Sequence, residues 1–211
     1  MRDFVEGGMG VAAGREHPSR MRLLYAALGV IRAKGYAATT VEEICGAAGV
    51  TKGSFFHHFK SKDDLALAAV ELWNRMTGGL FARAKYHEAA DPVDRLLGYV
   101  DFREEMLTGD LAEYTCLLGT LVQETYATHP AIREACEGGL AGHVAELTRD
   151  VEEARARYAP GAEWTAESVG NFMQAVLQGS FIFAKARQGP LVVRENLGHL
   201  RRYLEGLFGR E

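Results

Sequence analysis

The sequence predicts an all-α fold, with a small helix-turn-helix head near the N-terminal end and a larger helical body after it. Apolar residues make up 47% of the 211 residues, enough for a buried core, and they recur at helical spacings without long alternating segments. We expect the head over residues 18–65 and the body over residues 66–211. Residues 1–17 are Gly-rich and lack apolar periodicity, so we expect a disordered arm there.

The first predicted helix begins near Ser19, a residue type that caps helix N-termini. Leu24, Leu28 and Ile31 then line one face at spacings of three and four. Gly35 ends the helix, because glycine readily adopts the left-handed conformation that closes helices. We expect this helix to pack behind the next two and support them.

Capping patterns predict the next two helices and the tight turn between them. Thr40 and Glu43 have the spacing of a capping box, so a helix is predicted to begin just after Thr40. Gly49 ends this helix, and Thr51 caps the following one. Two phenylalanines of that second helix are four residues apart and should face the core, namely Phe55 and Phe59.

Helical periodicity continues through the body. Ser61 and Asp64 repeat the cap pattern and start a long helix at Lys62. No unit of about 20–50 residues repeats, so a solenoid is not expected. Further helix ends or starts are predicted at Asp91-Pro92, Thr108-Gly109-Asp110, His129-Pro130 and Tyr158-Ala159-Pro160-Gly161.

Charge is unevenly distributed along the chain. The net charge is −4, yet residues 15–62 hold eight Lys or Arg against three Glu, a net charge of +5. Residues 63–211 hold fifteen basic and twenty-three acidic residues, a net charge of −8. A basic head on an acidic body is typical of a DNA-binding protein with a second functional part.

The head resembles the TetR family of bacterial transcriptional repressors from Arg20 to Leu65, and beyond this stretch the match is architectural. The resemblance implies a homodimer that binds palindromic operator DNA and is released by a small, largely apolar effector. It implies no cofactor and no catalytic residue. The matching residues are Gly35-Tyr36, Thr40, Ile44, Ala48-Gly49-Val50, Phe59, Lys62 and Leu65.

The helix that follows Thr51 is the predicted recognition helix, because the second helix of this motif enters the major groove. Backbone N–H groups and small side chains of its first turn can approach phosphates or base edges. Phe56 stands where the family usually has a phosphate-binding tyrosine, so its contact must be apolar, and His57 fits a plain helix surface equally well. Lys62 matches a phosphate-contact position of the family. The predicted DNA-binding residues are Thr40, Thr51, Lys52, Gly53, Ser54, Phe56, His57, His58, Lys60 and Lys62.

The last two helical segments are strongly apolar, and the resemblance implies that they pair with their copies in a four-helix dimer interface. The alternative is that both bury against their own body. The predicted interface residues are Val169, Phe172, Val176, Phe181, Phe183, Leu197, Leu200, Leu204 and Leu207. An effector pocket is predicted from apolar and polar residues that also fit a plain core: Met106, Cys116, Leu117, Leu121, Glu124, Tyr126, Phe172 and Met173.

Three widely spaced cysteines, Cys45, Cys116 and Cys136, suggest neither a disulfide framework nor a metal site, and a reducing cytoplasm is expected. Cys116 could sense oxidants or electrophiles, but no basic residue lies within a turn of it in the sequence, and we interpret all three as buried structural thiols. Catalytic motifs such as H-E-x-x-H and G-x-S-x-G do not occur in a suitable context, so an enzyme is not expected. No apolar run reaches the length of about 18 residues that a membrane span needs. An architectural role on DNA and activation of transcription stay open as alternatives to repression.

Overall fold

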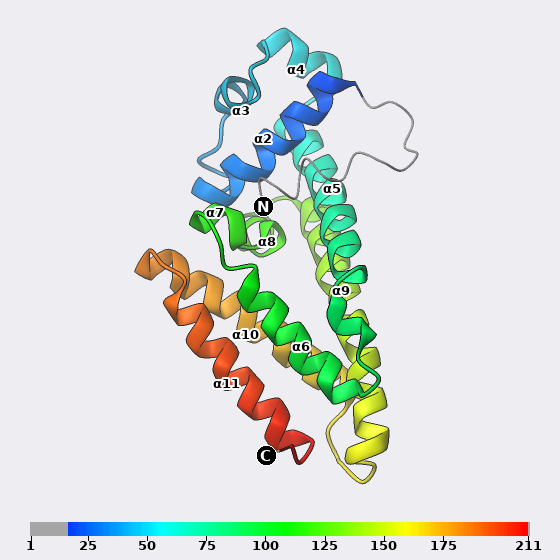
Figure 1. The fold of residues 1–211 in the computed structure, drawn as a ribbon. Helices are drawn as coiled ribbons and strands as arrows, with labels where there is room; N and C mark the ends of the chain where they lie inside the picture. The colour runs from blue at the N-terminus through cyan, green and yellow to red at the C-terminus, as the bar shows by residue number, and fades with distance from the viewer. Residues whose placement is uncertain (1–16, 211) are drawn as a thin grey trace. The chain divides into compact units, whose positions relative to one another are not determined.

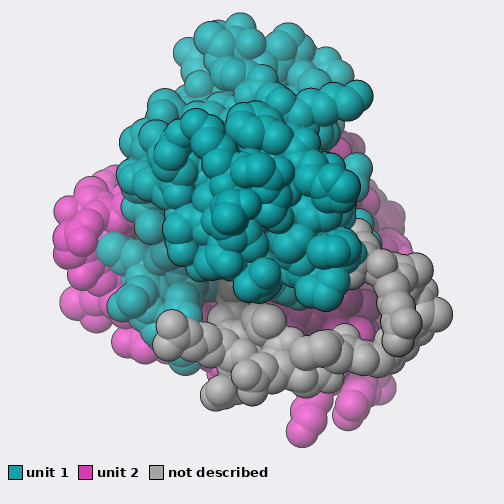
Figure 2. Space-filling model, turned by 90° about the horizontal axis from the view of Figure 1, so that it is seen from above, with its two compact units in different colours: residues 1–75, 108–137 teal, residues 76–107, 138–211 magenta. Residues whose placement is uncertain are grey.

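The computed structural model describes residues 17–210, so the predicted arm lies outside the described residues except for His17. The described part is helical and contains no strand, which confirms the all-α prediction (Figure 1). None of its helices is long and apolar enough to cross a membrane. The chain divides into two compact units, residues 1–75 with 108–137 and residues 76–107 with 138–211 (Figure 2). The division into a DNA-binding domain and an effector domain stays a prediction.

Unit 1 contains the predicted head and a second group of short helices. Side chains from several of these helices are fully buried together, including Leu24, Ile44, Phe55, Leu65 and Leu121. Its helices are α2 (Pro18–Lys34), α3 (Val41–Ala48), α4 (Lys52–His58), the first part of α5 (Lys62–Ala82), α7 (Leu111–Tyr114), α8 (Leu117–Thr125) and the first turns of α9 (Pro130–Tyr158).

The predicted caps of the head are confirmed at α3 and α4. Thr40 and Glu43 form both hydrogen bonds of a capping box at the start of α3. Gly49 ends α3 in the left-handed conformation, with φ of 61°. The Thr51 hydroxyl accepts a hydrogen bond from the N–H of Ser54 at 3.2 Å and caps α4. These caps satisfy backbone donors that a helix cannot satisfy internally, and they separate α3 from α4 by a short turn.

The start of α2 differs from the prediction. Its N-cap is His17, with Pro18 in the first turn, and Ser19 lies inside the helix. Proline suits this position because its missing N–H would have no intrahelical partner there. Ser19 is 8% exposed, and its hydroxyl is hydrogen-bonded to His17 and His58. The residue that resembled a cap thus connects α2 to α4.

Unit 2 is a helical bundle in which α11 packs on both α10 and α6. Tyr99, Met173 and Leu204 are among its buried side chains. The predicted start at Asp91-Pro92 is confirmed, and α9 ends at Tyr158, the first residue of the break predicted there. Unit 2 comprises the last part of α5, the 3-10 helix η1 (Lys85–Glu88), α6 (Pro92–Glu105), most of α9, α10 (Ala166–Arg187) and α11 (Leu191–Leu207).

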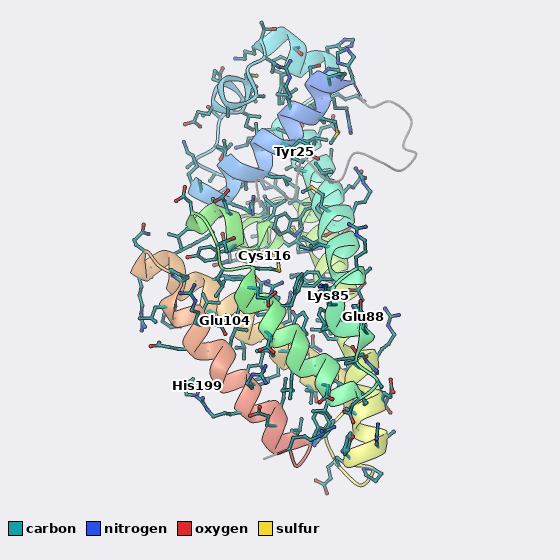
Figure 3. The ribbon with its side chains drawn as sticks, in the orientation of Figure 1. Tyr25, Lys85, Glu88, Glu104, Cys116 and His199 are labelled. Atoms are coloured by element: carbon teal, nitrogen blue, oxygen red, sulfur yellow. The ribbon has the colours of Figure 1, made fainter. Side chains whose placement is uncertain are left out.

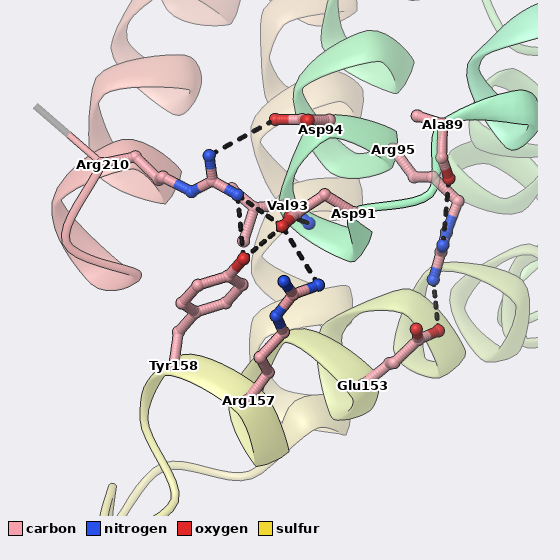
Figure 4. Close-up of polar contacts among 9 residues, drawn as sticks. All are labelled: Ala89, Asp91, Val93, Asp94, Arg95, Glu153, Arg157, Tyr158 and Arg210. Atoms are coloured by element: carbon pink, nitrogen blue, oxygen red, sulfur yellow. Dashed lines mark hydrogen bonds and ion pairs between the residues drawn. The ribbon is translucent and has the colours of Figure 1, made fainter.

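A charged network joins the start of α6, the end of α9 and the C-terminal end of the chain (Figure 4). The Asp91 carboxylate accepts hydrogen bonds from the Tyr158 hydroxyl and the Val93 N–H, and it pairs with Arg210 at 2.6 Å and Arg157 at 3.3 Å. Burial acts to raise the pKa of Asp91, but these hydrogen bonds and positive charges outweigh burial, and the pKa lies below its ordinary value. The network therefore holds α6, α9 and the C-terminal residues together at one end of unit 2.

Candidate nucleic-acid interface and dimer face

The two sides of α4 differ sharply in exposure. Phe55 and Phe59 are 0% and 2% exposed, which confirms them as core residues that attach α4 to the head. Phe56 is 54% exposed, and His57 is also exposed. The exposed ring is available for an apolar contact, such as one with a thymine methyl group.

The predicted DNA-binding residues lie at the start of α3, along α4 and around the start of α5, and all of them can be placed. Seven are exposed and three are half-buried. The exposed residues are Thr40, Thr51, Lys52, Gly53, Phe56, His57 and Lys60, and the half-buried residues are Ser54, His58 and Lys62.

Two lysines on this side of the head form ion pairs with the first turn of α3. Lys52 pairs with Glu42, and Lys34 pairs with Glu43. The Lys52 and Glu42 side chains are 56% and 64% exposed. Exposed pairs of this kind contribute little free energy, so a DNA phosphate can compete with Glu42 for Lys52.

His58 connects helices rather than presenting a free imidazole. Its Nε2 lies 2.6 Å from the Ser19 hydroxyl, which lies 2.8 Å from Nδ1 of His17. Burial lowers the pKa of His58, and the neighbouring His57, His17 and Arg20 lower it further. A neutral imidazole is a weak partner for phosphate, so the contact with Ser19 is the better-defined role of His58.

Lys62 also contacts the protein itself. Its Nζ donates hydrogen bonds to the carbonyl oxygens of Tyr36 and Thr39, both at 3.0 Å, and lies 4.2 Å from the centre of the Tyr36 ring. An ammonium group has three donors, so one is left for the predicted phosphate contact. Two donors hold the turn between α2 and α3.

We expect Lys62→Ala to destabilise the protein by about 1–3 kcal/mol, because two half-buried carbonyl groups lose their partner. Urea unfolding at fixed protein concentration measures this loss. Lys60→Ala is the control, since Lys60 is exposed and its loss should cost less than about 0.5 kcal/mol. Equal stabilities of the two variants would show that Lys62 does not hold the turn.

An open groove of about 340 Å³ lies between α10 and α11 in unit 2. Phe172 and Phe183 are 43% and 52% exposed at this groove, and the Phe172 ring lies 4.8 Å from that of Tyr203. Residues of α10 at spacings of three and four form one wall of the groove, and α11 forms the other. His199, which is labelled in Figure 3, belongs to the α11 wall. The lining residues are Phe172, Ala175, Val176, Gly179, Ser180, Phe183, Asn196, His199 and Leu200.

Five of the nine predicted interface residues are buried within unit 2 itself, and the dimer interface stays a prediction. Phe172, Val176 and Phe183 line the groove, and Leu207 is half-buried. A helix that is apolar nearly all round does not reveal which side packs on its own chain. The buried residues are Val169 (2% exposed), Phe181 (4%), Leu197 (1%), Leu200 (2%) and Leu204 (0%), of which Leu200 also lines the groove.

The eight predicted pocket residues do not gather within either unit. Leu117, Leu121 and Met173 are core residues at 0% exposure. Tyr126 is 63% exposed and Phe172 lines the open groove, and the effector pocket stays a prediction. The remaining residues are Met106 at the end of α6, Cys116 at the start of α8, and Glu124, whose carboxylate contacts the head.

The cysteines have different environments. Cys45 and Cys136 are buried, as predicted, and burial raises the pKa of both thiols, that of Cys136 to about 12. Cys116 is only half-buried and is the N-cap residue of α8 (Figure 3), so the prediction of a buried thiol is wrong there. Among residues 17–210, no group of three His, Cys, Asp or Glu side chains could hold a metal ion.

Two contacts within unit 1 were not predicted. The Ala37 N–H donates to Glu124 at 2.7 Å, and Arg32, at 6% exposure, donates to the Leu28 and Glu113 carbonyl groups. The Ala37–Glu124 and Arg32–Glu113 bonds connect α2 and the turn after it to the α7–α8 region, across more than eighty residues of sequence. Helical spacing carries no signal for such pairs.

Comparisons with known proteins agree with this geometry. Residues 23–69 match the model of bacterial regulatory proteins of the tetR family. The transcriptional regulator AcuR of Cereibacter sphaeroides is 29% identical over 168 residues, which cover 80% of this chain and 77% of AcuR. The transcriptional repressor KstR2 of Mycobacterium tuberculosis is 36% identical over 88 residues, 41% of this chain and 42% of KstR2. The crystal structure of a regulatory protein TetR from Rhodobacter sphaeroides has a TM-score of 0.79 and 27% identity, covering 91% of this chain and all of that one.

The family match spans most of α2, all of α3 and α4, and the start of α5. The family match therefore includes α4 with its exposed face and the helices next to it. The structural similarity extends over both units. Regulators of this family bind DNA and are not enzymes. The chain is therefore a DNA-binding transcriptional regulator of the tetR family.

Proposed function

We propose that this regulator is a homodimeric repressor that binds a palindromic operator and leaves it when a small molecule binds. The observation that carries the proposal is the exposed face of α4, with Thr51, Lys52, Gly53 and Phe56 on a helix fixed to the head by Phe55 and Phe59. A buried side that fixes the helix and an exposed side with donors are what major-groove reading requires.

In this proposal the residues around α4 have three different roles: phosphate contact, base contact and support of the helix. Lys52, Lys60 and the third donor of Lys62 contact phosphates and set the register on the duplex. Residues 51–54 reach phosphates or base edges, and Phe56 contacts a thymine methyl group or a sugar. The half-buried His58 holds α4 through Ser19, so we assign it a supporting role.

The second copy of the chain is proposed to cover the α10–α11 groove. A self-complementary apolar face suits a twofold interface, since each residue then meets its counterpart or a neighbour of it. Such a dimer presents two heads to half-sites about 34–36 Å apart, or a multiple of that distance, and the operator is therefore palindromic. The name of the relative KstR2 as a repressor supports repression over activation.

Release requires an effector that binds one conformation better than another. An effector that favours a dimer with wrongly spaced heads weakens DNA binding, and bound DNA weakens effector binding by the same factor. The family resemblance makes a small, largely apolar molecule the expected class. Action on chromosomal DNA places the protein in the cytoplasm.

Selection of bound duplexes from a random DNA pool, at two salt concentrations, tests the proposal. We expect one palindromic motif whose binding weakens steeply with salt. Lys52→Ala should lower the salt slope by about 0.9 for one lost phosphate contact. Lys85→Ala is the control, because Lys85 is an exposed lysine of unit 2 (labelled in Figure 3) and should leave the slope unchanged.

The outcomes separate the alternatives. Salt-sensitive binding without a motif would replace the repressor with a non-specific architectural role. An unchanged slope for Lys52→Ala would remove this lysine from the interface. Absence of binding by protein refolded to remove bound small molecules would overturn the proposal.

A further inference from the structure

The turn between α2 and α3, residues 35–39, is held from one side by the head itself. Lys62 satisfies the carbonyl groups of Tyr36 and Thr39, and the Thr39 hydroxyl donates to the Gly35 carbonyl at 2.6 Å. Thr39 is 1% exposed, so this last bond is buried. Because α3 starts directly after this turn, the turn sets the position of α3 and of the α4 helix that follows.

The end of α8 holds the same turn from the other side. Glu124 Oε2 accepts a hydrogen bond from the Ala37 N–H at 2.7 Å. The same carboxylate lies against Gly35, where any Cβ would overlap it, and Gly35 also has a positive φ of 89°. Glycine is therefore required there for two reasons, its backbone conformation and the closeness of Glu124. Both contacts lie within unit 1.

A further contact comes from the segment after α8. The His129 ring meets the Tyr36 ring edge-on, with 5.4 Å between centroids, and His129 Nε2 lies 3.8 Å from Asp63. Asp63 also accepts a hydrogen bond from the Tyr36 hydroxyl. The turn thus contacts the start of α5 and the α8–α9 junction at once.

Glu124 does not serve the helix that carries it. It lies in the last turn of α8, which contains no basic residue, and a negative charge there opposes the negative end of the helix dipole. Glutamate at this position destabilises α8, and the contact with the turn offsets this effect. The placement of this charge is explained by the head and not by α8.

We propose that Glu124 is a positioning residue for the DNA-binding head. Its carboxylate holds the α2–α3 turn to the end of α8, so that the position of α8 and the engagement of DNA by α4 are coupled. This inference rests on the proposed function, because it takes α4 as the DNA-binding helix. Coupling is reciprocal, so operator binding must also stabilise the end of α8.

Operator affinity tests the positioning role. We expect Glu124→Ala to bind the selected duplex about three- to tenfold more weakly, the loss associated with one hydrogen bond, without a change in salt slope. Glu124→Gln keeps an acceptor and should stay within about twofold of the unmodified protein. Glu134→Ala, which removes an exposed carboxylate of α9 in the same unit, should bind no more weakly.

A purely electrostatic role gives the opposite result. Removing a negative charge from a DNA-binding unit would then tighten binding, equally for Glu124→Ala and Glu124→Gln. Tighter or unchanged binding by Glu124→Ala would overturn the inference. Circular dichroism at the assay temperature establishes that each variant is folded, so weaker binding reports positioning.

Hydrogen exchange measured with and without the selected duplex tests the coupling separately. In the unmodified protein, DNA should slow amide exchange in residues 51–59 and also in residues 117–129. In Glu124→Ala, only residues 51–59 should be protected. Protection of residues 117–129 in both proteins, or in neither, would overturn the coupling. No protection of residues 51–59 in the unmodified protein would count against the proposed function instead.

Discussion

Phe172→Asp is expected to turn a dimer into a monomer and to weaken operator binding by about a hundredfold or more. Phe172 is 43% exposed in the single chain and lines the α10–α11 groove, so the change costs little within unit 2. Across a twofold interface, each copy would bury an unpaired carboxylate, which costs several kcal/mol. In a dimer, binding of the first head holds the second head at its half-site with an effective concentration of the order of millimolar, and a monomer lacks this gain.

Sedimentation velocity and operator titration measure the two effects on the same sample. Tyr126→Asp is the matched control, because Tyr126 is an aromatic residue of unit 1 that is 63% exposed and does not line the groove, and this variant should remain a dimer. Phe181→Asp should unfold unit 2 instead, since Phe181 is 4% exposed. If Phe172→Asp is folded and still dimeric, the α10–α11 groove is not the dimer interface.

Local rules predicted the head well because its signals are short-range. The capping box at Thr40 and Glu43, the left-handed Gly49 and the cap at Thr51 each depend on residues within four positions of one another. At the start of α2 the same reasoning predicted Ser19 as the cap. Residue type alone does not distinguish a serine at the cap from a serine inside the first turn. The helix instead starts at Pro18 with His17 as its cap, and Ser19 pairs with the distant His58.

The faces of the later helices could not be predicted in the same way. Phe181 and Phe183 are two residues apart on an apolar helix, yet the first is buried and the second is exposed. The packing of α10 against α11, and of Phe181 against Arg103 of α6, decides between them. The contact of Glu124 with Ala37 likewise joins residues 87 positions apart. Such pairs depend on tertiary packing, and a single sequence contains no pattern that selects them.

A buried histidine in unit 2 leads to the second prediction of large effect. His143 lies 4.5 Å from the Phe81 ring centroid, and its Nε2 is 2.9 Å from the Tyr99 hydroxyl. Burial, helped by the positive charge of Arg103, lowers the pKa of His143 to about 3. The Glu146 carboxylate, 3.7 Å from Nδ1, favours the protonated form, but burial dominates.

Stability should therefore fall in mild acid. Above the unfolded-state pKa of about 6.5, neither the folded nor the unfolded chain protonates this histidine. Between about 6.5 and the folded pKa of about 3, only the unfolded chain binds the proton, so unfolding becomes easier as pH falls. The loss is about 1.4 kcal/mol for each pH unit below 6.5, or about 2 kcal/mol at pH 5 compared with pH 7.

Urea unfolding at pH 7 and pH 5, at one protein concentration, measures this loss. His143→Phe keeps an aromatic ring in the cluster but removes the titrating group, so its loss between the two pH values should be smaller by about 2 kcal/mol. The comparison uses a difference within each variant, and a lower absolute stability from the lost hydrogen bond between His143 and the Tyr99 hydroxyl does not affect it. His57→Gln, a change of an exposed histidine in the head, should keep the full pH dependence. Equal pH dependence in His143→Phe and the unmodified protein would mean that His143 is not held neutral by burial, and the acid sensitivity would then belong to other groups.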